Sequence, residues 1–154
     1  MVKEKSTTSL RIVNKKARFE YEVLERVEAG IALCGSEVKS IRNGQVSLDE
    51  AFARIVDGEV YLYGCHISPY EQAGKQNHDP VRPRKLLLHR REIKRLTGPV
   101  REKGQTLVPL AIYFSSRGLA KVDLALVRGK SSYDKRQQIK RREQEHEIAR
   151  ALGG

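Results

Sequence analysis

Hydrophobic and polar residues alternate along most of the chain. Phe19, Tyr21 and Val23 are separated by Glu20 and Glu22, a period of two that is typical of a strand with one buried face. The strands predicted from such segments cover residues 19–23, 31–33, 52–56, 59–65, 85–88, 106–114 and 119–127. Because short connections join most of them, consecutive strands are expected to pair antiparallel.

Glycine marks the turns between these strands. Asp57-Gly58 is the strongest hairpin signal, because both residues tolerate the positive φ angles of a two-residue turn. Residues 28–30 predict a turn after the first strand, and residues 115–118 predict one between the last two. Pro109 has no N–H for a strand ladder, so its strand is expected to lie at an edge or to bulge there.

Short helices are predicted between the strands. One covers residues 36–42, with Ser36 as its N-terminal cap and the Asn-Gly pair at 43–44 as its stop signal. Another covers residues 90–96 and is expected to end at residues 97–99, Thr-Gly-Pro. The fold class expected is mainly β, with six or seven strands closed into an antiparallel barrel and two or three short flanking helices.

Two segments depart from this pattern. Residues 69–83 form a long loop rich in Gly, Gln, Asn and Pro, a composition expected of a functional or mobile segment. Residues 130–154 have few apolar side chains, although residues 137–150 have high helix propensity. We expect this tail to be disordered when free and helical against a polyanion.

The formal charge of +11 is unevenly distributed. Residues 1–18 carry a net +5, residues 82–103 a net +7 and residues 128–154 a net +4, whereas residues 19–81 carry a net −6. Clustered positive charge attracts polyanions by releasing their condensed counterions. This distribution favours a nucleic-acid partner over a surface charged only for solubility. A membrane surface is disfavoured, because the basic segments lack the Trp, Phe and Leu face of an interfacial helix.

The sequence lacks the features of a membrane or secreted protein. No apolar segment approaches the roughly 20 residues of a membrane helix, and the first ten residues contain no hydrophobic signal-peptide core. Cys34 and Cys65 are the two cysteines. Isolated thiols suit a reducing cytoplasm, and both are expected to be small buried core residues.

No arrangement of residues typical of an enzyme is present. The four histidines lack metal-binding spacing, and Gly129-Lys130-Ser131 lacks the upstream glycine of a P-loop. His78-Asp79 is a weak candidate metal site, for which a solvated pair in a loop is the favoured interpretation. We therefore expect neither catalysis nor a bound metal or cofactor.

Recognition of unpaired RNA requires basic groups for phosphates and exposed aromatic or guanidinium planes for bases. Tyr61 and Tyr63 share one face of their strand and can serve as stacking surfaces, but packing in the core is the favoured interpretation. The signature of an RNA-recognition motif is absent from the sequence.

Several segments, taken together, resemble one bacterial family. The matching segments are residues 14–21, 28–33, 35–42, 57–59, 79–80, 84–88, 129–130 and 134–136. In this order and spacing, across about residues 12–142, the chain resembles the small protein B family, the SsrA-binding proteins that partner transfer-messenger RNA (tmRNA).

The resemblance implies an OB-like barrel over residues 12–128, a flexible basic segment at 1–11 and a basic tail at 129–154. It implies an RNA-binding factor, not an enzyme, that binds the tRNA-like domain of tmRNA and delivers it to stalled ribosomes. The tail would become helical in the empty mRNA channel near the decoding centre of the small subunit. Elongation factor Tu would be an indirect partner through charged tmRNA, and the protein would be a cytoplasmic monomer.

Site residues follow from the resemblance and from the basic side chains. The predicted RNA-binding residues are Asn14, Lys15, Arg18, Glu28, Lys39, Arg42, Lys85, Leu87 and His89. The predicted ribosome-binding residues of the tail are Gly129, Lys130, Tyr133, Asp134, Lys135 and Arg136. Without the resemblance, Glu28 is an ordinary turn residue and Leu87 a core residue. Lys39 and Arg42 lie three positions apart on one helical face, which suits phosphates or salt bridges to the acidic body.

Two positions differ from those of some relatives. His89 stands where some carry Asn; both can hydrogen-bond a base or sugar, and His brings pH dependence near neutrality. Tyr133 stands where some carry His. Since Tyr can stack on a base but cannot supply a proton near pH 7, stacking is its expected role.

Two other functions remain open on the residues alone. A ribosomal or general RNA-binding protein with no preference for tmRNA would also explain the basic ends. A metal-dependent nuclease would use His78 and Asp79 and would cleave RNA when divalent ions are added.

Overall fold

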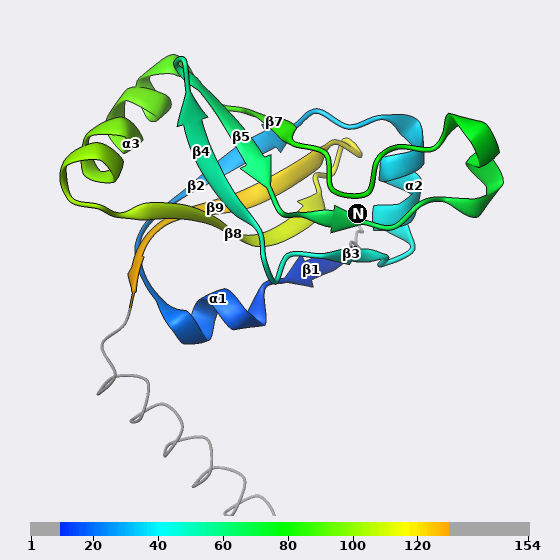
Figure 1. Cartoon of the computed structure of the whole chain (residues 1–154), viewed down its shortest axis with the longest axis horizontal. Coiled ribbons are helices and arrows are strands. Elements are labelled where there is room, and N and C mark those ends of the chain that lie inside the picture. The colour runs from blue at the N-terminus through cyan, green and yellow to red at the C-terminus, as the bar shows by residue number, and fades with distance from the viewer. Residues whose placement is uncertain (1–9, 130–154) are drawn as a thin grey trace, which may run out of the picture.

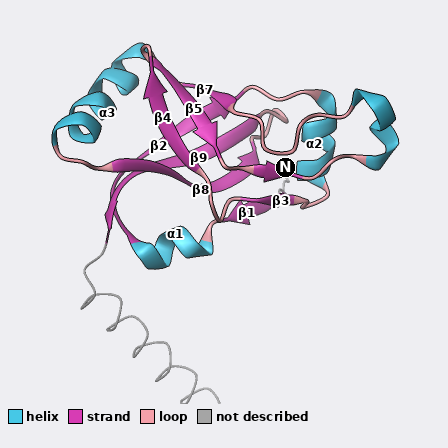
Figure 2. Cartoon of the chain, in the orientation of Figure 1, coloured by secondary structure: helices cyan, strands magenta, loops and turns pink. Residues whose placement is uncertain are grey.

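A ring of antiparallel strands forms the centre of the protein, and the computed structural model describes residues 10–129 of it (Figures 1 and 2). The strands are β1 (Arg11–Val13), β2 (Tyr21–Ile31), β3 (Val46–Ser47), β4 (Phe52–Val56), β5 (Glu59–Tyr63), β6 (His66–Ile67), β7 (Arg84–Leu87), β8 (Thr106–Phe114) and β9 (Ala120–Gly129). The helices are α1 (Lys15–Glu20), α2 (Gly35–Arg42), α3 (Arg90–Glu102) and the 3₁₀ segment η2 (Glu71–Gln76).

The strand order shows that the ring is closed. Hydrogen bonds connect β8, β4, β5, β7, β2 and β9 in sequence, and β9 pairs back with β8. The strand β1 pairs with the second half of β8, and β3 and β6 form a separate two-stranded sheet. The predicted closed antiparallel barrel of six or seven strands with short flanking helices is therefore confirmed. Within the described residues no helix has the length and hydrophobicity required to cross a membrane.

The barrel interior is filled by alternate residues of each strand. In β5, Val60 and Leu62 are completely buried, whereas Tyr61 and Tyr63 are half-buried on the outer face. Tyr63 stacks on Phe52 with 5.6 Å between ring centroids. The predicted packing of the two tyrosines in the core was wrong, because the aliphatic residues of the same strand occupy the interior.

A second apolar cluster lies outside the ring, where α1 covers β8 and β9 (Figure 1). Ala17 of α1 packs there with Val108, Leu110, Ala125 and Val127. Both faces of these two strands are consequently buried along much of their length, which explains their nearly continuous hydrophobic sequence.

The N-terminal hairpin predicted from residues 19–33 is absent; β2 instead runs without a turn through residues 28–30. Its ladder with β9 extends from the pair Tyr21 and Gly129 to the pair Gly30 and Lys121, and β7 takes the other edge of its last residues. Hydrogen bonding along both edges therefore overrides the local turn preference of Glu-Ala-Gly.

The helix α1 was not predicted. Its cap is Asn14, whose side-chain oxygen accepts a hydrogen bond from the Ala17 N–H at 3.0 Å. The helix is only six residues long and mostly polar, and it includes Phe19, which the alternation assigned to a strand. Burial of Ala17 against β8 and β9 is what stabilises it.

Two other predicted helices differ from the structure only at their ends. The helix α2 begins after Cys34, not after Ser36, and Cys34 is exposed, so its predicted burial was wrong; Cys65 is buried as predicted. The helix α3 continues through Pro99 to Glu102, beyond the expected stop, because the Lys103 N–H bonds the Pro99 carbonyl at 3.0 Å.

One predicted turn and one predicted bulge are confirmed. Asp57 and Gly58, which join β4 to β5, have φ angles of 51° and 76°, as a type I′ hairpin turn requires. The ladder between β8 and β9 shifts register between Pro109 and Ala111, which is the bulge expected at the proline. The carbonyl of Pro109 accepts a hydrogen bond from the buried Asn14 amide at 2.9 Å.

A buried ion cluster connects α2 to β7. Glu37 and Arg84 are fully buried, and Arg84 Nε donates to Glu37 Oε2 at 2.5 Å. Arg82 donates to both oxygens of the same carboxylate, and the Cys34 N–H donates to it at 2.9 Å. Arg84 Nη1 also donates to the carbonyl of Cys65 at 2.7 Å. The cluster therefore satisfies buried charges that would otherwise destabilise the fold.

We expect Glu37→Gln to lower the free energy of unfolding by about 3–5 kcal/mol, because it leaves the Arg84 guanidinium buried without its carboxylate. Chemical denaturation at neutral pH measures the loss. Glu22→Gln is the matched control, since Glu22 pairs with Arg128 on the surface at 2.8 Å and is expected to cost less than about 1 kcal/mol. Equal losses in the two variants would contradict the role given to Glu37.

The ionised Glu37 carboxylate makes the stability of the fold sensitive to acid. Burial opposes ionisation of Glu37, but hydrogen bonds from Arg82, the Cys34 backbone and Arg84 outweigh it and lower its pKa from 4.5 to about 2. A carboxyl with a lower pKa in the folded protein stabilises it above the unfolded pKa, and this contribution is lost as the pH falls through the folded value. The stability difference between wild type and Glu37→Gln should therefore shrink between pH 4.5 and about 2. A difference that stays constant over this range would refute the assignment.

Candidate nucleic-acid interface

A groove of about 540 Å³ lies on the outer face of the barrel, between β2, β7 and the start of α3. Four of the residues predicted to bind RNA line it: Glu28, Lys85, Leu87 and His89. They come from two segments that are distant in the sequence, β2 and residues 85–89, and the pairing of β2 with β7 brings them together.

Residues that pair across five neighbouring strands extend this surface beyond the groove. Leu87 lies opposite Gly30, Gly30 opposite Lys121, Lys121 opposite Tyr113, and Tyr113 opposite Arg11. Residues opposite one another in a ladder project from the same face of a sheet. The row therefore joins an apolar side chain, a bare backbone position and two cations on one outer face.

Gly30 gives Leu87 its place in the groove. A Cβ atom at Gly30 would lie 3.2 Å from the Leu87 Cβ, tighter than ordinary packing. The Leu87 side chain is 52% exposed, so the core position indicated by the residue pattern alone was wrong. An exposed aliphatic side chain beside a polar groove can pack against the face of an unpaired base.

His89 lies at the end of the groove as the N-terminal cap of α3. Its N–H donates to Glu92 Oε1 at 2.9 Å, which is one half of a capping box. The His89 side chain itself is exposed. The helix start therefore holds the backbone of His89 while its ring faces solvent.

The charges of the groove are partly paired. Lys85 lies 3.4 Å from Glu59, whereas Lys121 has no ion pair within residues 10–129. Glu28 accepts a hydrogen bond from the Tyr113 hydroxyl. Lys121 and Tyr113 were not among the predicted site residues, because only the ladder register connects them to Gly30.

The residues of α1 lie outside this groove. Asn14 is 2% exposed, and its amide donates to the carbonyls of Leu48 and Pro109 at 3.0 and 2.9 Å. Its side chain is thus committed to capping α1 and to joining it to the barrel. Lys15 and Arg18 are exposed on that helix.

Lys39 and Arg42 form a third area on α2. The Lys39 ammonium lies 5.4 Å from the centroid of Tyr70, and the Arg42 guanidinium lies 4.3 Å from that of Phe114. Both side chains are exposed. In Figure 1, α2 and α3 lie toward opposite ends of the molecule, so this area is separate from the groove beside α3.

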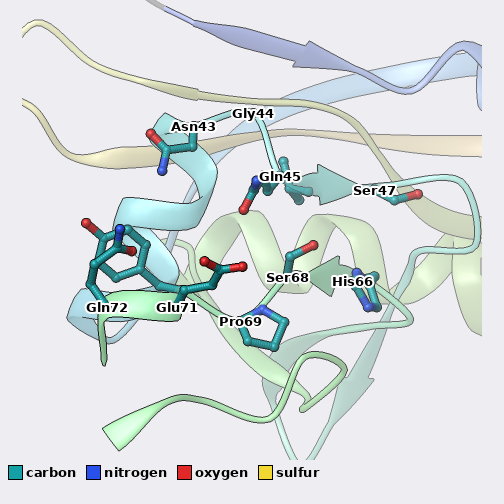
Figure 3. Close-up of a pocket in the computed structure, with 11 residues that line it drawn as sticks. Asn43, Gly44, Gln45, Ser47, His66, Ser68, Pro69, Glu71 and Gln72 are labelled. Atoms are coloured by element: carbon teal, nitrogen blue, oxygen red, sulfur yellow. The ribbon is translucent and has the colours of Figure 1, made fainter. Parts of the chain in front are cut away.

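A larger hollow of about 690 Å³ adjoins α2 (Figure 3). Its polar lining includes Gln45, Ser47, His66, Ser68 and Glu71, drawn as sticks in the figure. It contains none of the residues predicted to bind RNA. We assign no ligand to it.

His78 is a structural residue. Its Nε2 lies 2.9 Å from the carbonyl of Ile67, and its Nδ1 lies 2.8 Å from Ser36 Oγ. The ring is 9% exposed, so the prediction that His78 and Asp79 form a solvated pair was wrong for His78. Among residues 10–129 no group of three or more metal-binding side chains converges.

The predicted tail site falls mostly outside the described residues. Gly129 ends β9 opposite Tyr21. Lys130, Tyr133, Asp134, Lys135 and Arg136 lie beyond the described range, as does most of the segment 1–11. Arg11 is an exception, because it opens β1.

A closed antiparallel barrel of this size, with a charged and partly apolar groove on its outer face, defines the class of OB-like nucleic-acid-binding domains. The SmpB protein family matches residues 11–154. The chain belongs to this family.

Individual relatives agree with that assignment. The chain is 60% identical to the SsrA-binding protein of Symbiobacterium thermophilum, covering 92% of this chain and 89% of that protein. It is 61% identical to the SsrA-binding protein of Chloroflexus aggregans, covering 90% and 88%. It also resembles a chain of the solved structure described as "tmRNA-SmpB: a journey to the center of the bacterial ribosome", with a TM-score of 0.69, 52% identity and coverage of 84% and 94%.

We expect Lys121→Gln to reduce the slope of log affinity against log salt concentration by about 1, because one phosphate contact is lost. Binding of a folded, tRNA-sized RNA over a series of salt concentrations measures the slope. Lys75→Gln removes the same charge from η2, which does not line the groove, and should leave the slope unchanged. Equal slopes for both variants would exclude Lys121 from the interface.

Proposed function

We propose that this protein binds the tRNA-like domain of tmRNA and delivers it to stalled ribosomes for trans-translation. The observation that carries the proposal is the groove, which gathers Glu28, Lys85, Leu87 and His89 on one face of the barrel. Membership of the SmpB family and the solved tmRNA–SmpB structure on the bacterial ribosome support it independently.

The groove offers a different chemistry to each part of an RNA. Leu87 packs on an exposed base, and His89 hydrogen-bonds a base or sugar. Lys85 and Lys121 bind phosphates. Glu28 accepts hydrogen bonds from amino, imino or 2′-hydroxyl groups, since a carboxylate is an acceptor only.

The other predicted residues act outside the groove. Asn14 contributes by fixing α1, which presents Lys15 and Arg18 to phosphates. Lys39 and Arg42 present cations backed by aromatic rings at the far end of the barrel. An RNA the size of the tRNA-like domain is large enough to reach beyond one groove, so these areas extend the electrostatic surface.

We further propose that residues 129–154 occupy the empty mRNA channel and decoding centre of the small subunit, as a helix. Lys130, Lys135 and Arg136 bind ribosomal RNA phosphates there, and Tyr133 stacks on a base. Gly129 and Asp134 are part of the same segment. The protein acts as a monomer in the cytoplasm, where ribosomes are, and meets elongation factor Tu indirectly through charged tmRNA.

Binding and delivery of RNA need no bond-making step by the protein itself. The described residues offer charged, apolar and hydrogen-bonding surfaces that suit this role. We therefore propose a non-enzymatic RNA-binding factor that works without a cofactor.

Truncation after Gly129 tests this division of roles. We expect affinity for the tRNA-like domain to stay within about twofold, because the barrel and groove remain complete, while tagging of stalled peptides is lost. Filter binding and an in vitro tagging reaction measure the two properties. A matched chain with the charge of Lys135 and Arg136 reversed should behave like the truncation.

Loss of RNA affinity in a truncated protein that keeps its thermal unfolding transition would contradict the proposal. It would move the main RNA contact from the barrel to the tail. Retention of full tagging activity would equally exclude a role for the tail on the ribosome.

A further inference from the structure

Glu28 is an unusual residue for a groove that binds RNA, because its carboxylate repels phosphates. It lines the groove, and it has no ion-pair partner within residues 10–129. The nearby Asp123 differs, since Arg11 and Arg26 both donate to it. The charge of Glu28 therefore remains available to an external hydrogen-bond donor.

One contact fixes this carboxylate. The Tyr113 hydroxyl donates to Glu28 Oε2, and Oε1 accepts no hydrogen bond from the described residues. Tyr113 belongs to β8 and Glu28 to β2, with β9 between them, so the tyrosine reaches across a strand to make the bond. Tyr113 does not line the groove.

Arg11 contacts the ring of Tyr113 and holds it in place. The Arg11 guanidinium lies over its ring, 4.8 Å from the centroid, and donates to Asp123 at 3.3 Å. Burial, together with the hydrogen bond to Glu28, raises the pKa of Tyr113 to about 12. The hydroxyl therefore keeps its proton, and remains a donor, throughout the physiological pH range.

We propose that Tyr113 is a positioning residue for RNA recognition, holding the Glu28 carboxylate so that its free oxygen accepts a hydrogen bond from a base or 2′-hydroxyl of the bound RNA. This inference rests on the proposed function, since it needs Glu28 to face the tRNA-like domain. A fixed acceptor favours an RNA that presents a donor at that point and disfavours a bare phosphate backbone. The pair thus contributes selectivity more than affinity.

The test compares two RNAs with the full-length protein: the tRNA-like domain of tmRNA and an unstructured RNA of equal length. Tyr113→Phe keeps the ring under Arg11 and removes only the hydroxyl. We expect it to weaken binding of the tRNA-like domain about fivefold to tenfold and to leave the unstructured RNA unchanged. Tyr63→Phe is the matched control: Tyr63 is a half-buried tyrosine of β5 whose ring stacks on Phe52, and the variant should change neither affinity.

A double-mutant cycle separates positioning from a purely structural role. Glu28→Ala should weaken binding of the tRNA-like domain, because the hydrogen-bond acceptor is lost. It should not weaken binding of the unstructured RNA, because the substitution removes a negative charge. In that background Tyr113→Phe should have less than about a twofold further effect. Glu28→Asp keeps the charge but shortens its reach, and it provides the same test should Tyr113→Phe fail to fold.

The outcomes are distinguishable. If wild type shows no preference for the tRNA-like domain, the proposed function fails. If wild type shows the preference, three results would overturn the role of Tyr113 and leave the proposed function standing. Tyr113→Phe could leave the preference intact, or it could weaken binding of both RNAs equally. Its effect on affinity could also add in full to that of Glu28→Ala.

Discussion

The buried ion cluster of Glu37 with Arg84 is the constraint on which the groove depends. Arg84 is the first residue of β7, and its side chain points into the protein to reach Glu37 on α2. Successive residues of a strand point to opposite faces. With Arg84 buried, Lys85 and Leu87 must therefore project outward, and Leu86 must enter the core.

A slip of β7 by one residue would reverse these faces. Lys85 and Leu87 would then face the interior, Arg84 would leave Glu37, and the groove would lose the two side chains that β7 contributes to it. Replacing a buried ion pair by apolar residues often costs little stability, so the value of this cluster lies in specifying register. It also ties α2 to the loop before β7 through Arg82. Stability and recognition are thus linked through one strand.

The sequence predicted the parts of this structure that depend on local chemistry. The Asp57-Gly58 turn and the helix α2 follow from residues close together in the chain. The predictions failed where distant contacts decide: β2 ignores a turn signal because two neighbours bond its edges, and α1 forms because its Ala17 is buried on the barrel.

The candidate site also depends on contacts between residues that are distant in the sequence. Glu28 and Leu87 entered the predicted site through resemblance to a family, and their residue patterns alone pointed to a turn and to the core. The structure places both in one groove because Gly30 pairs with Leu87. Lys121 and Tyr113 were missed, since nothing in the linear sequence relates them to Gly30 before the register of β8 and β9 is known.

The proposed function requires that this barrel prefer the tRNA-like domain of tmRNA to other RNAs, including ordinary tRNA. The most direct measurement is competition binding near a salt concentration of about 150 mM, where contacts to phosphates alone are already weakened. Labelled tRNA-like domain of tmRNA is challenged with an elongator tRNA and with an unstructured RNA of equal length. We expect neither competitor to displace the tRNA-like domain at equal concentration. If both competitors displaced it as effectively as the unlabelled tRNA-like domain does, the proposed preference would be contradicted and a general RNA-binding protein would be indicated.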